Sequence, residues 1–215
     1  ITEESPLSTN NPYGENKLMV EKKLKDITFS DKNWHVIILR YFNPVGAHES
    51  GLIGEDPNGE PSNLMPYVAQ VAIGKLHHIN VFGNDYPTYD GSGVRDYIHV
   101  MDLAAGHIKA LNVIDGDGSY QIFNLGTGSG HSVFDIIKAF AKVSGRKIGY
   151  EIVSRRAGDV AECYADPSFS KKILNWEAKL GLNKMIEDHW NWQVNNPSGY
   201  NNSPVPEIVV IPPGK

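Results

Sequence analysis

The stretch from His35 to Phe42 (HVIILRYF) constrains the fold most strongly, because it is almost continuously apolar and rich in β-branched residues. Such a run is typical of a strand in a parallel sheet that is covered on both faces. It ends at Asn43-Pro44, and open α/β sheets bind their ligands at the carboxyl ends of strands. We therefore predict an α/β fold in which Tyr41, Phe42 and Asn43 lie near a site. Alternatively, Asn43 only opens the turn before the proline.

A helix is predicted just before this strand, over residues 12–26. Asn11 suits the N-cap, and Pro12 suits the first helical position because its missing N–H costs nothing there. Tyr13 and Lys17 are four residues apart and share one face of this helix. A free tyrosine has a pKa of roughly 10 and is a poor base at neutral pH. An ammonium one turn away favours the phenolate, so the pair indicates a general base. The alternative is a half-buried tyrosine and a solvated lysine.

Other elements follow from local signals. We predict a loop over residues 44–63, a helix from Leu64 to about residue 75 and a strand over residues 79–82. Asp102 is expected to cap a helix, and residues 115–118 (DGDG) to form a turn. Ser132 is expected to open a further helix with a capping-box pattern.

Composition argues against several classes of function. The 215 residues carry a net charge of −5 with acids and bases mixed, whereas a nucleic-acid binder would show a basic patch. The single cysteine, Cys163, excludes an internal disulfide and indicates a reducing, cytoplasmic environment. We recognise no apolar run of membrane-spanning length and no signal peptide. His77 and His78 are adjacent without a suitably spaced third ligand, so we predict no metal site.

Several longer motifs occur in one order along the chain. They are Tyr13-x-x-x-Lys17, Arg40–His48 (RYFNPVGAH), Gly51–Pro57 (GLIGEDP), Asn63–Tyr67 (NLMPY) and Gly93–Val100 (GVRDYIHV). The first resembles the catalytic pair of short-chain dehydrogenase/reductases. The others resemble the UDP-glucose 4-epimerases of the extended, nucleotide-sugar branch, and the resemblance runs from about residue 1 to residue 201.

The resemblance implies the C-terminal portion of a Rossmann-like parallel sheet plus a smaller α/β substrate-binding domain. We expect residues 1–48 to belong to the NAD-binding domain, with residues 96–125 packing back on it. Residues 49–202 would form the UDP-sugar-binding domain, and residues 203–215 are a tail to which we assign no role.

The family's G-x-x-G-x-x-G turn, which holds the NAD pyrophosphate, does not occur in this sequence. Gly126-x-Gly128-x-Gly130 follows a predicted strand but lacks the later glycine. The Ser/Thr that the family pairs with its tyrosine is also missing. We therefore expect this chain to be part of a longer protein, to be inactive alone and to bind NAD poorly. The complete enzyme is expected to be a homodimer.

The resemblance also implies residue roles in NAD-dependent epimerisation at C4 of UDP-glucose and UDP-galactose through a 4-keto sugar. Tyr13 would take the proton of the sugar 4-OH, and Lys17 would hold the nicotinamide ribose. Tyr41 and Phe42 would line the nicotinamide pocket. Arg95 and Arg156 would grip the diphosphate as guanidinium forks, although an isolated arginine more often makes surface ion pairs. The other substrate-binding residues implied are Tyr41, Phe42, Asn43, Ser62, Asn63, Leu64, Asn80, Val81, Phe82, Tyr97, Asp159 and Cys163. Asp159 would accept from the ribose hydroxyls, and Phe82 would pack near the uracil.

Cys163 stands where the family carries either a bulky tyrosine or a smaller residue. A cysteine leaves room for an N-acetyl group on the sugar, so we hypothesise that the complete enzyme also interconverts UDP-GlcNAc and UDP-GalNAc. The alternative is a small buried apolar residue without that role. Two other functions stay open: another extended-branch enzyme, such as a dehydratase or decarboxylase, or an inactive fragment that binds UDP-sugars.

Overall fold

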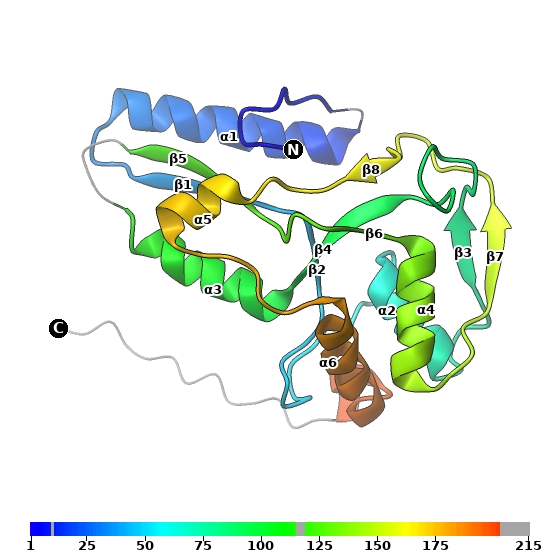
Figure 1. Ribbon diagram of the computed structural model, residues 1–215. Helices are drawn as coiled ribbons and strands as arrows, with labels where there is room; N and C mark the ends of the chain where they lie inside the picture. The colour runs from blue at the N-terminus through cyan, green and yellow to red at the C-terminus, as the bar shows by residue number, and fades with distance from the viewer. Residues whose placement is uncertain (10, 115–118, 203–215) are drawn as a thin grey trace.

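A computed structural model describes residues 1–9, 11–114 and 119–202 (Figure 1). The helices are α1 (Pro12–Ser30), α2 (Leu64–Ala72), α3 (Val100–Leu111), α4 (Val133–Ser144), α5 (Ser168–Leu174) and α6 (Leu182–Asn195), followed by a 3-10 turn over Gly199–Asn202. The strands are β1 (Val36–Tyr41), β2 (Asn43–Val45), β3 (Ile79–Phe82), β4 (Val94–His99), β5 (Tyr120–Leu125), β6 (Gly130–Ser132), β7 (Tyr150–Val153) and β8 (Glu162–Cys163). The turn predicted at 115–118 and the tail at 203–215 lie outside the described residues.

The apolar run from His35 to Phe42 contains β1, which pairs in parallel with β5 from Val36↔Tyr120 to Tyr41↔Leu125. Helix α1 lies on one side of this pair and α3 on the other (Figure 1). A hydrophobic cluster fills the space around β5, α3 and α5, with Phe123 and Leu125 fully buried at its centre. The expected α/β arrangement, with a parallel strand covered on both faces, is confirmed.

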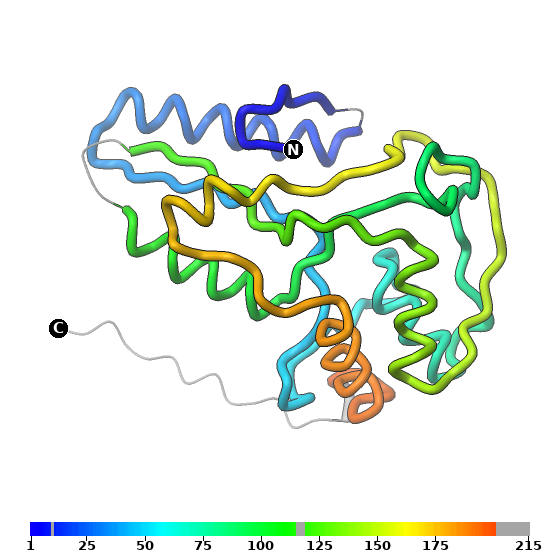
Figure 2. The backbone as a smooth tube through the Cα atoms, in the orientation of Figure 1, coloured from blue at the N-terminus to red at the C-terminus, as the bar shows by residue number. Residues whose placement is uncertain are grey.

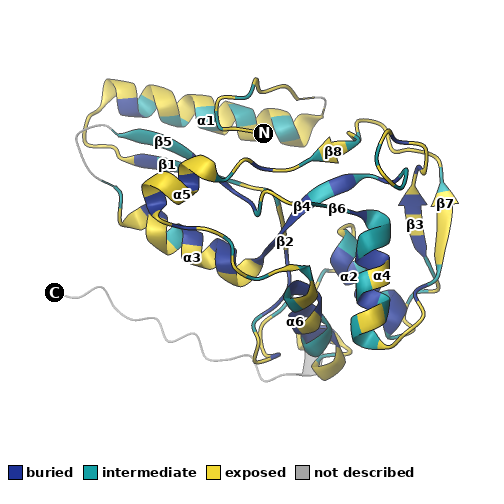
Figure 3. Cartoon of the chain, in the orientation of Figure 1, coloured by how far each residue is buried: buried dark blue, intermediate teal, exposed yellow. Residues whose placement is uncertain are grey.

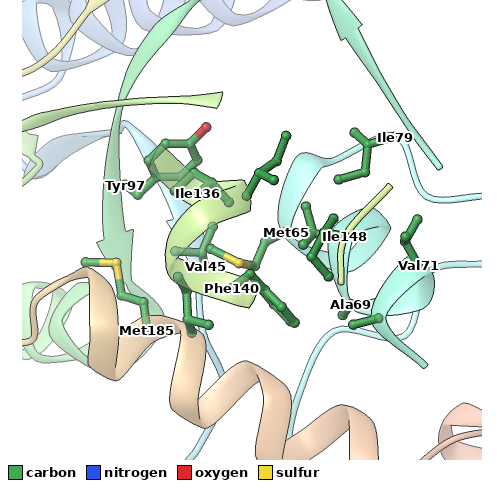
Figure 4. Packing of buried hydrophobic residues seen from close by; sticks show 14 of the residues in the cluster. Val45, Met65, Ala69, Val71, Ile79, Tyr97, Ile136, Phe140, Ile148 and Met185 are labelled. Carbon is green, nitrogen blue, oxygen red and sulfur yellow. The ribbon is translucent and has the colours of Figure 1, made fainter. Parts of the chain in front are cut away.

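A second hydrophobic cluster lies at the other end of the molecule, where α2, α4 and α6 pack on one another and Ile79 and Val81 of β3 join them. Strand β3 pairs in parallel with β7. Figure 4 shows Met65 from α2, Phe140 from α4 and Met185 from α6 converging on this cluster. The chain crosses between the two ends of the molecule more than once (Figure 2). The two ends are therefore held together by the strands and loops that cross between them.

Strand β4 is the main link between the two ends. It pairs in parallel with β2 and β8 and antiparallel with β6. Its fully buried Asp96 accepts hydrogen bonds from the amides of Thr127 at 2.9 Å, Gly128 at 3.0 Å and Ala165 at 3.1 Å. One carboxylate thus fixes the turn after β5 and the segment after β8 against β4.

Two predicted helix starts are confirmed in atomic detail. The Asn11 side chain accepts from the Gly14 amide at 2.8 Å, and Ser132 and Asp135 form the reciprocal capping box at the start of α4. Helix α1 runs to Ser30, four residues beyond the predicted end at 26. The extension is explained by Thr28, which is buried, so the last turn still has an inward-facing side chain.

Three local predictions were wrong. Residues 44 and 45, the first of the predicted loop, belong instead to strand β2, which exists because β4 offers it a parallel partner. Helix α2 ends at Ala72, three residues early, because Gly74 adopts a φ of 81° and breaks the helix. Asp102 does not cap α3. The cap is His99, whose side chain accepts from the Met101 amide, whereas the Asp102 carboxylate accepts from the distant amides of Lys179 and Leu180.

In the described ranges, no helix is both long and apolar enough to cross a membrane. The same ranges contain no group of three or more side chains arranged to hold a metal ion. The predicted domain boundary at residue 48 stays a prediction. The packing adds that Leu174 and Trp176, far beyond that boundary, share the cluster around Phe123.

Candidate functional site

A cavity of about 440 Å³ lies between β2, β3, β4 and the first residues of α2 and α4. Ten of the predicted substrate-binding residues line it: Asn43, Ser62, Asn63, Leu64, Asn80, Phe82, Arg95, Tyr97, Arg156 and Asp159. They come from five separate stretches of the sequence. The fold therefore brings the predicted phosphate, ribose and uracil residues to one place.

Arg156 and Asp159 form the outer wall of this cavity, just after β7. The Arg156 Nε lies 3.0 Å from the Asp159 Oδ2, and its guanidinium carbon lies 4.8 Å from the centroid of the Phe82 ring. A backbone bond from the Asp159 amide to the Arg156 carbonyl, at 3.3 Å, closes the turn that holds them. The cation and the aromatic face are thus already in contact, with a carboxylate beside them.

Arg95 enters the cavity from β4, where its Cα partners are His131 on β6 and Cys163 on β8. Its Nη1 donates to the Val94 carbonyl at 2.8 Å. Burial raises the pKa of the neighbouring Tyr97 to about 12, with Arg95 opposing that shift, so this phenol stays neutral at physiological pH. Cys163 stands beside the cavity rather than in its wall. Partial burial raises the pKa of its thiol, with the nearby Arg95 again opposing the shift.

The other predicted residues lie outside this cavity wall. Tyr13 and Lys17 do share a face of α1, and the Lys17 Nζ lies 5.2 Å from the Tyr13 ring centroid. The Tyr13 side chain is 73% exposed and does not line the cavity. Val81 is buried in the core and 1% exposed, because it points to the opposite face of β3 from Asn80 and Phe82.

Tyr41 and Phe42 lie at the carboxyl end of β1 and beyond it. The Tyr41 hydroxyl lies 2.7 Å from Nε2 of His107, while Nδ1 of the same ring lies 2.9 Å from the Leu103 carbonyl. Because a carbonyl only accepts, Nδ1 carries the proton, and Nε2 accepts from the Tyr41 hydroxyl. Phe42 is half-buried beside Gly126, where an added Cβ would lie 3.1 Å from its ring.

The lining residues that the sequence did not predict include Glu60, Tyr67, Tyr86 and Val133. The Tyr67 hydroxyl donates to Glu60 at 2.9 Å, and burial together with Glu60 raises the pKa of Tyr67. A signal existed for two of them, since Tyr67 ends the NLMPY motif and Val133 follows the Ser132 cap. Nothing local pointed to Glu60 or Tyr86.

The chemistry of this wall suits an anionic ligand with a flat ring. Two guanidinium groups are available for phosphate oxygens. The N-terminus of α2, whose N-cap Asn63 makes no side-chain cap hydrogen bond, adds backbone N–H groups. Phe82 presents an aromatic face, and Asp159 and the asparagines offer acceptors for hydroxyls.

Residues 1–126 match the sequence profile of the NAD dependent epimerase/dehydratase family. The chain belongs to this family. It is 58% identical over 200 residues to the UDP-glucose 4-epimerase of Bacillus subtilis, covering 93% of this chain and 59% of that relative. The resemblance to the UDP-glucose 4-epimerases is therefore confirmed.

Solved structures in the family agree with the fold. The UDP-glucose 4-epimerase from Bifidobacterium longum, in complex with NAD+ and UDP, superposes with a TM-score of 0.89 at 54% identity, covering 93% of this chain and 59% of that one. The UDP-Glc/GlcNAc 4-epimerase of Campylobacter jejuni gives a TM-score of 0.73 at 35% identity, with 91% and 59% coverage. This chain spans about three fifths of the length of these relatives, and the Rossmann-like α/β fold is confirmed.

Proposed function

We propose that the complete protein is a UDP-glucose 4-epimerase that interconverts UDP-glucose and UDP-galactose, and that this chain supplies its UDP-sugar site. The observation that carries the proposal is the meeting of Arg95, Arg156, Asp159 and Phe82 in one cavity of about 440 Å³. The support is chemical, because guanidinium forks bind phosphate oxygens bidentately and a flat aromatic side chain can stack on a uracil.

The contacts within the cavity suggest how the ligand is received. Arg156 now pairs with Asp159 at its Nε, and its guanidinium has further N–H groups to offer a phosphate oxygen. Asp159 is the acceptor we assign to the ribose hydroxyls. Arg95 would approach the diphosphate from β4, and the α2 N-terminus, with Asn63 and Leu64, would face the same charge.

The cofactor we propose is NAD, held jointly with the rest of the protein. The four residues that we assign to NAD binding fit that group, because Tyr13 and Tyr41 are exposed and neither Lys17 nor Phe42 is buried. When bound, NAD supplies reversible hydride acceptance at the sugar C4. Tyr13, as the phenolate that the Lys17 ammonium favours, would take the proton of the 4-OH and become a neutral phenol.

We also propose that α1 is covered in the complete protein, which would be a homodimer. Met19, Val20 and Phe29 on α1 are exposed large apolar side chains, and Figure 3 shows most of this helix as exposed. Among the described residues, β1 has β5 as its only strand partner. Residues 1–48 would then belong to the NAD-binding domain, and residues 49–202 would carry the sugar nucleotide.

A finer proposal concerns the sugar. Cys163 stands opposite Arg95 on the adjacent strand, and its side chain is small. We propose that the complete enzyme also accepts UDP-GlcNAc and UDP-GalNAc, because a cysteine leaves room where a tyrosine would not. The Campylobacter jejuni relative is described as acting on both the Glc and the GlcNAc forms.

The test uses two preparations. Isothermal titration of the 215-residue chain with UDP asks whether the cavity binds, and we expect saturable binding without NAD. A chimera that joins this chain to the N-terminal part of the Bacillus subtilis relative asks whether it catalyses. We expect the chimera to convert UDP-galactose to UDP-glucose, and we expect Tyr13→Phe to lower kcat by about 10²-fold or more, the usual contribution of a general base.

A second test is Lys17→Met, and its matched control is Lys23→Met. Both lysines lie on α1, but only Lys17 contacts Tyr13. We expect Lys17→Met to be slow and Lys23→Met to match the parent. A chimera that binds UDP but has no Tyr13-dependent turnover would make this a binding protein instead. A chain that does not bind UDP would contradict the proposal altogether.

A further inference from the structure

Two consecutive arginines follow β7, and only the second of them belongs to the cavity wall. Arg156 lines the cavity, whereas Arg155 does not. Arg155 instead reaches back to the loop after β3, where its Nε donates to the Asp85 carboxylate at 2.7 Å and its Nη2 donates to the Asp85 carbonyl at 2.5 Å. The two stretches also continue the β3–β7 ladder, through a bond from the Gly83 amide to the Val153 carbonyl at 2.9 Å.

The Arg155 side chain also covers Tyr86. Its guanidinium carbon lies 4.0 Å from the centroid of the Tyr86 ring. Tyr86 is buried, 7% exposed, and lines the cavity. Its ring thus contacts both Arg155 and the cavity. The two arginines repeat one arrangement, Arg155 on Tyr86 and Arg156 on Phe82.

Gly83 makes this close packing possible. Its φ is 85°, and a Cβ there would lie 2.7 Å from the Arg155 Cγ and 2.9 Å from the Tyr86 ring. The loop after β3 must therefore turn through a glycine directly beneath the arginine. The Arg155 and Asp85 side chains are 43% and 70% exposed. The close contacts with Gly83 and Tyr86 nevertheless fix the position of Arg155.

We infer that Arg155 is a positioning residue for the diphosphate of the sugar nucleotide. It ties the segment that carries Arg156 and Asp159 to the loop that carries Tyr86 and directly follows Phe82, so both walls of the cavity keep one spacing. The inference rests on the proposed function. In this role Arg155 acts through Arg156 and Tyr86 and does not touch the ligand.

The test compares UDP with uridine in titrations of the 215-residue chain, because only UDP carries the diphosphate. We expect Arg155→Ala to raise the Kd for UDP about fivefold, the size of one ion pair and one cation–π contact, and to change the Kd for uridine less than about twofold. Asp85→Asn should also raise the Kd for UDP. The double variant should show less than the sum of the two effects, because both changes break one unit.

Two further variants separate positioning from charge and from general stability. Arg155→Lys keeps the charge but loses the planar fork, so we expect it to behave like Arg155→Ala. Lys171→Ala removes the exposed ion pair with Glu177, away from the cavity, and should leave the Kd for UDP unchanged.

Full rescue by Arg155→Lys would assign the effect to charge and overturn the inference. The inference would also be overturned if Arg155→Ala left the Kd for UDP unchanged, or if it raised the Kd for UDP and for uridine by the same factor. In these cases the parent chain still binds UDP, and the proposed function stands. A parent chain that does not bind UDP would overturn both.

Discussion

Cys163 stands directly opposite Arg95 on neighbouring parallel strands, β8 and β4, so the cysteine is anchored beside a cavity arginine. We predict that Cys163→Tyr in the chimera lowers turnover of UDP-GalNAc by about tenfold, because overfilling a packed site typically costs about 1–3 kcal/mol and tenfold corresponds to about 1.4 kcal/mol. Turnover of UDP-galactose should fall much less. Coupled assays with each sugar nucleotide measure the ratio.

The control for this change is Cys163→Ser, which keeps the volume of the side chain and should keep both activities. If Cys163→Tyr lowered the turnover of both substrates equally, the tyrosine would be acting on the fold or on Arg95 rather than on the N-acetyl group. If the parent chimera did not turn over UDP-GalNAc at all, the finer specificity would be refuted.

Arg156 is expected to carry much of the affinity for the diphosphate. We predict that Arg156→Ala raises the Kd of the chain for UDP by about tenfold, since a hydrogen bond to a charged group is worth roughly 1.5–3 kcal/mol. Arg146→Ala removes the same charge from an exposed position outside this cavity and should change the Kd little. Equal effects of the two variants would mean that net charge, not the Arg156 contact, governs binding.

Local signals predicted the elements that depend on local chemistry. The Asn11 cap and the Ser132–Asp135 capping box are set by residues within three positions of one another, so the sequence alone predicts them. Strands β2 and β8 span three and two residues and exist only through β4. The role of Asp102 could not be predicted locally either, because its carboxylate accepts hydrogen bonds from amides 77 and 78 residues away.

The residues of the candidate site show the same difference between local signals and tertiary packing. Arg95 was found because it lies in the GVRDYIHV motif, and Arg156 and Phe82 because the family resemblance implies them; the fold brings the three together. Glu60 and Tyr86 were missed because their place in the wall depends on tertiary packing, which no local pattern records. Val81 was grouped with its neighbours, but strand alternation turns its side chain into the core.

A buried charge network below β4 is expected to be essential for stability. Nδ1 of His99 accepts from the Met101 amide, so Nε2 carries the proton and donates to Asp188 at 3.0 Å. Asp188 also accepts from Lys184 at 2.8 Å. We predict that Asp188→Ala lowers the free energy of unfolding by about 3–5 kcal/mol, as expected when one partner of a buried pair is removed. Urea denaturation measures this change.

The matched control is Lys184→Ala, which removes the partner whose side chain is 40% exposed. Its effect should stay below about 1 kcal/mol, because solvent screens the exposed end. Similar losses in the two variants would show that Asp188 depends mainly on the lysine, contrary to this account.

The last prediction concerns acid stability and His189, which is fully buried in α6. Burial lowers its pKa from 6.5 to about 4, and a backbone contact with Gly46 opposes the shift without cancelling it. Above about pH 6.5 the histidine is neutral in both states, and its contribution is fully retained. As the pH falls from 6.5 towards 4, the unfolded chain takes up the proton first, and stability is lost. The loss should reach about 2 kcal/mol at pH 5 and about 3 kcal/mol below pH 4.

Urea denaturation at pH 7.5 and pH 5 measures the loss, and His189→Leu isolates it, because the variant should lose less stability over the same interval. Asp90, whose pKa is already lowered by hydrogen bonds from Ser132 and Ser92 despite its burial, stays ionised in this range and adds little. Since a leucine in α6 risks disturbing the fold, NMR of the His189 ring in the unaltered chain gives a second readout. A ring that titrates near pH 6.5 would contradict the prediction, because a histidine with an ordinary pKa takes up its proton equally in both states.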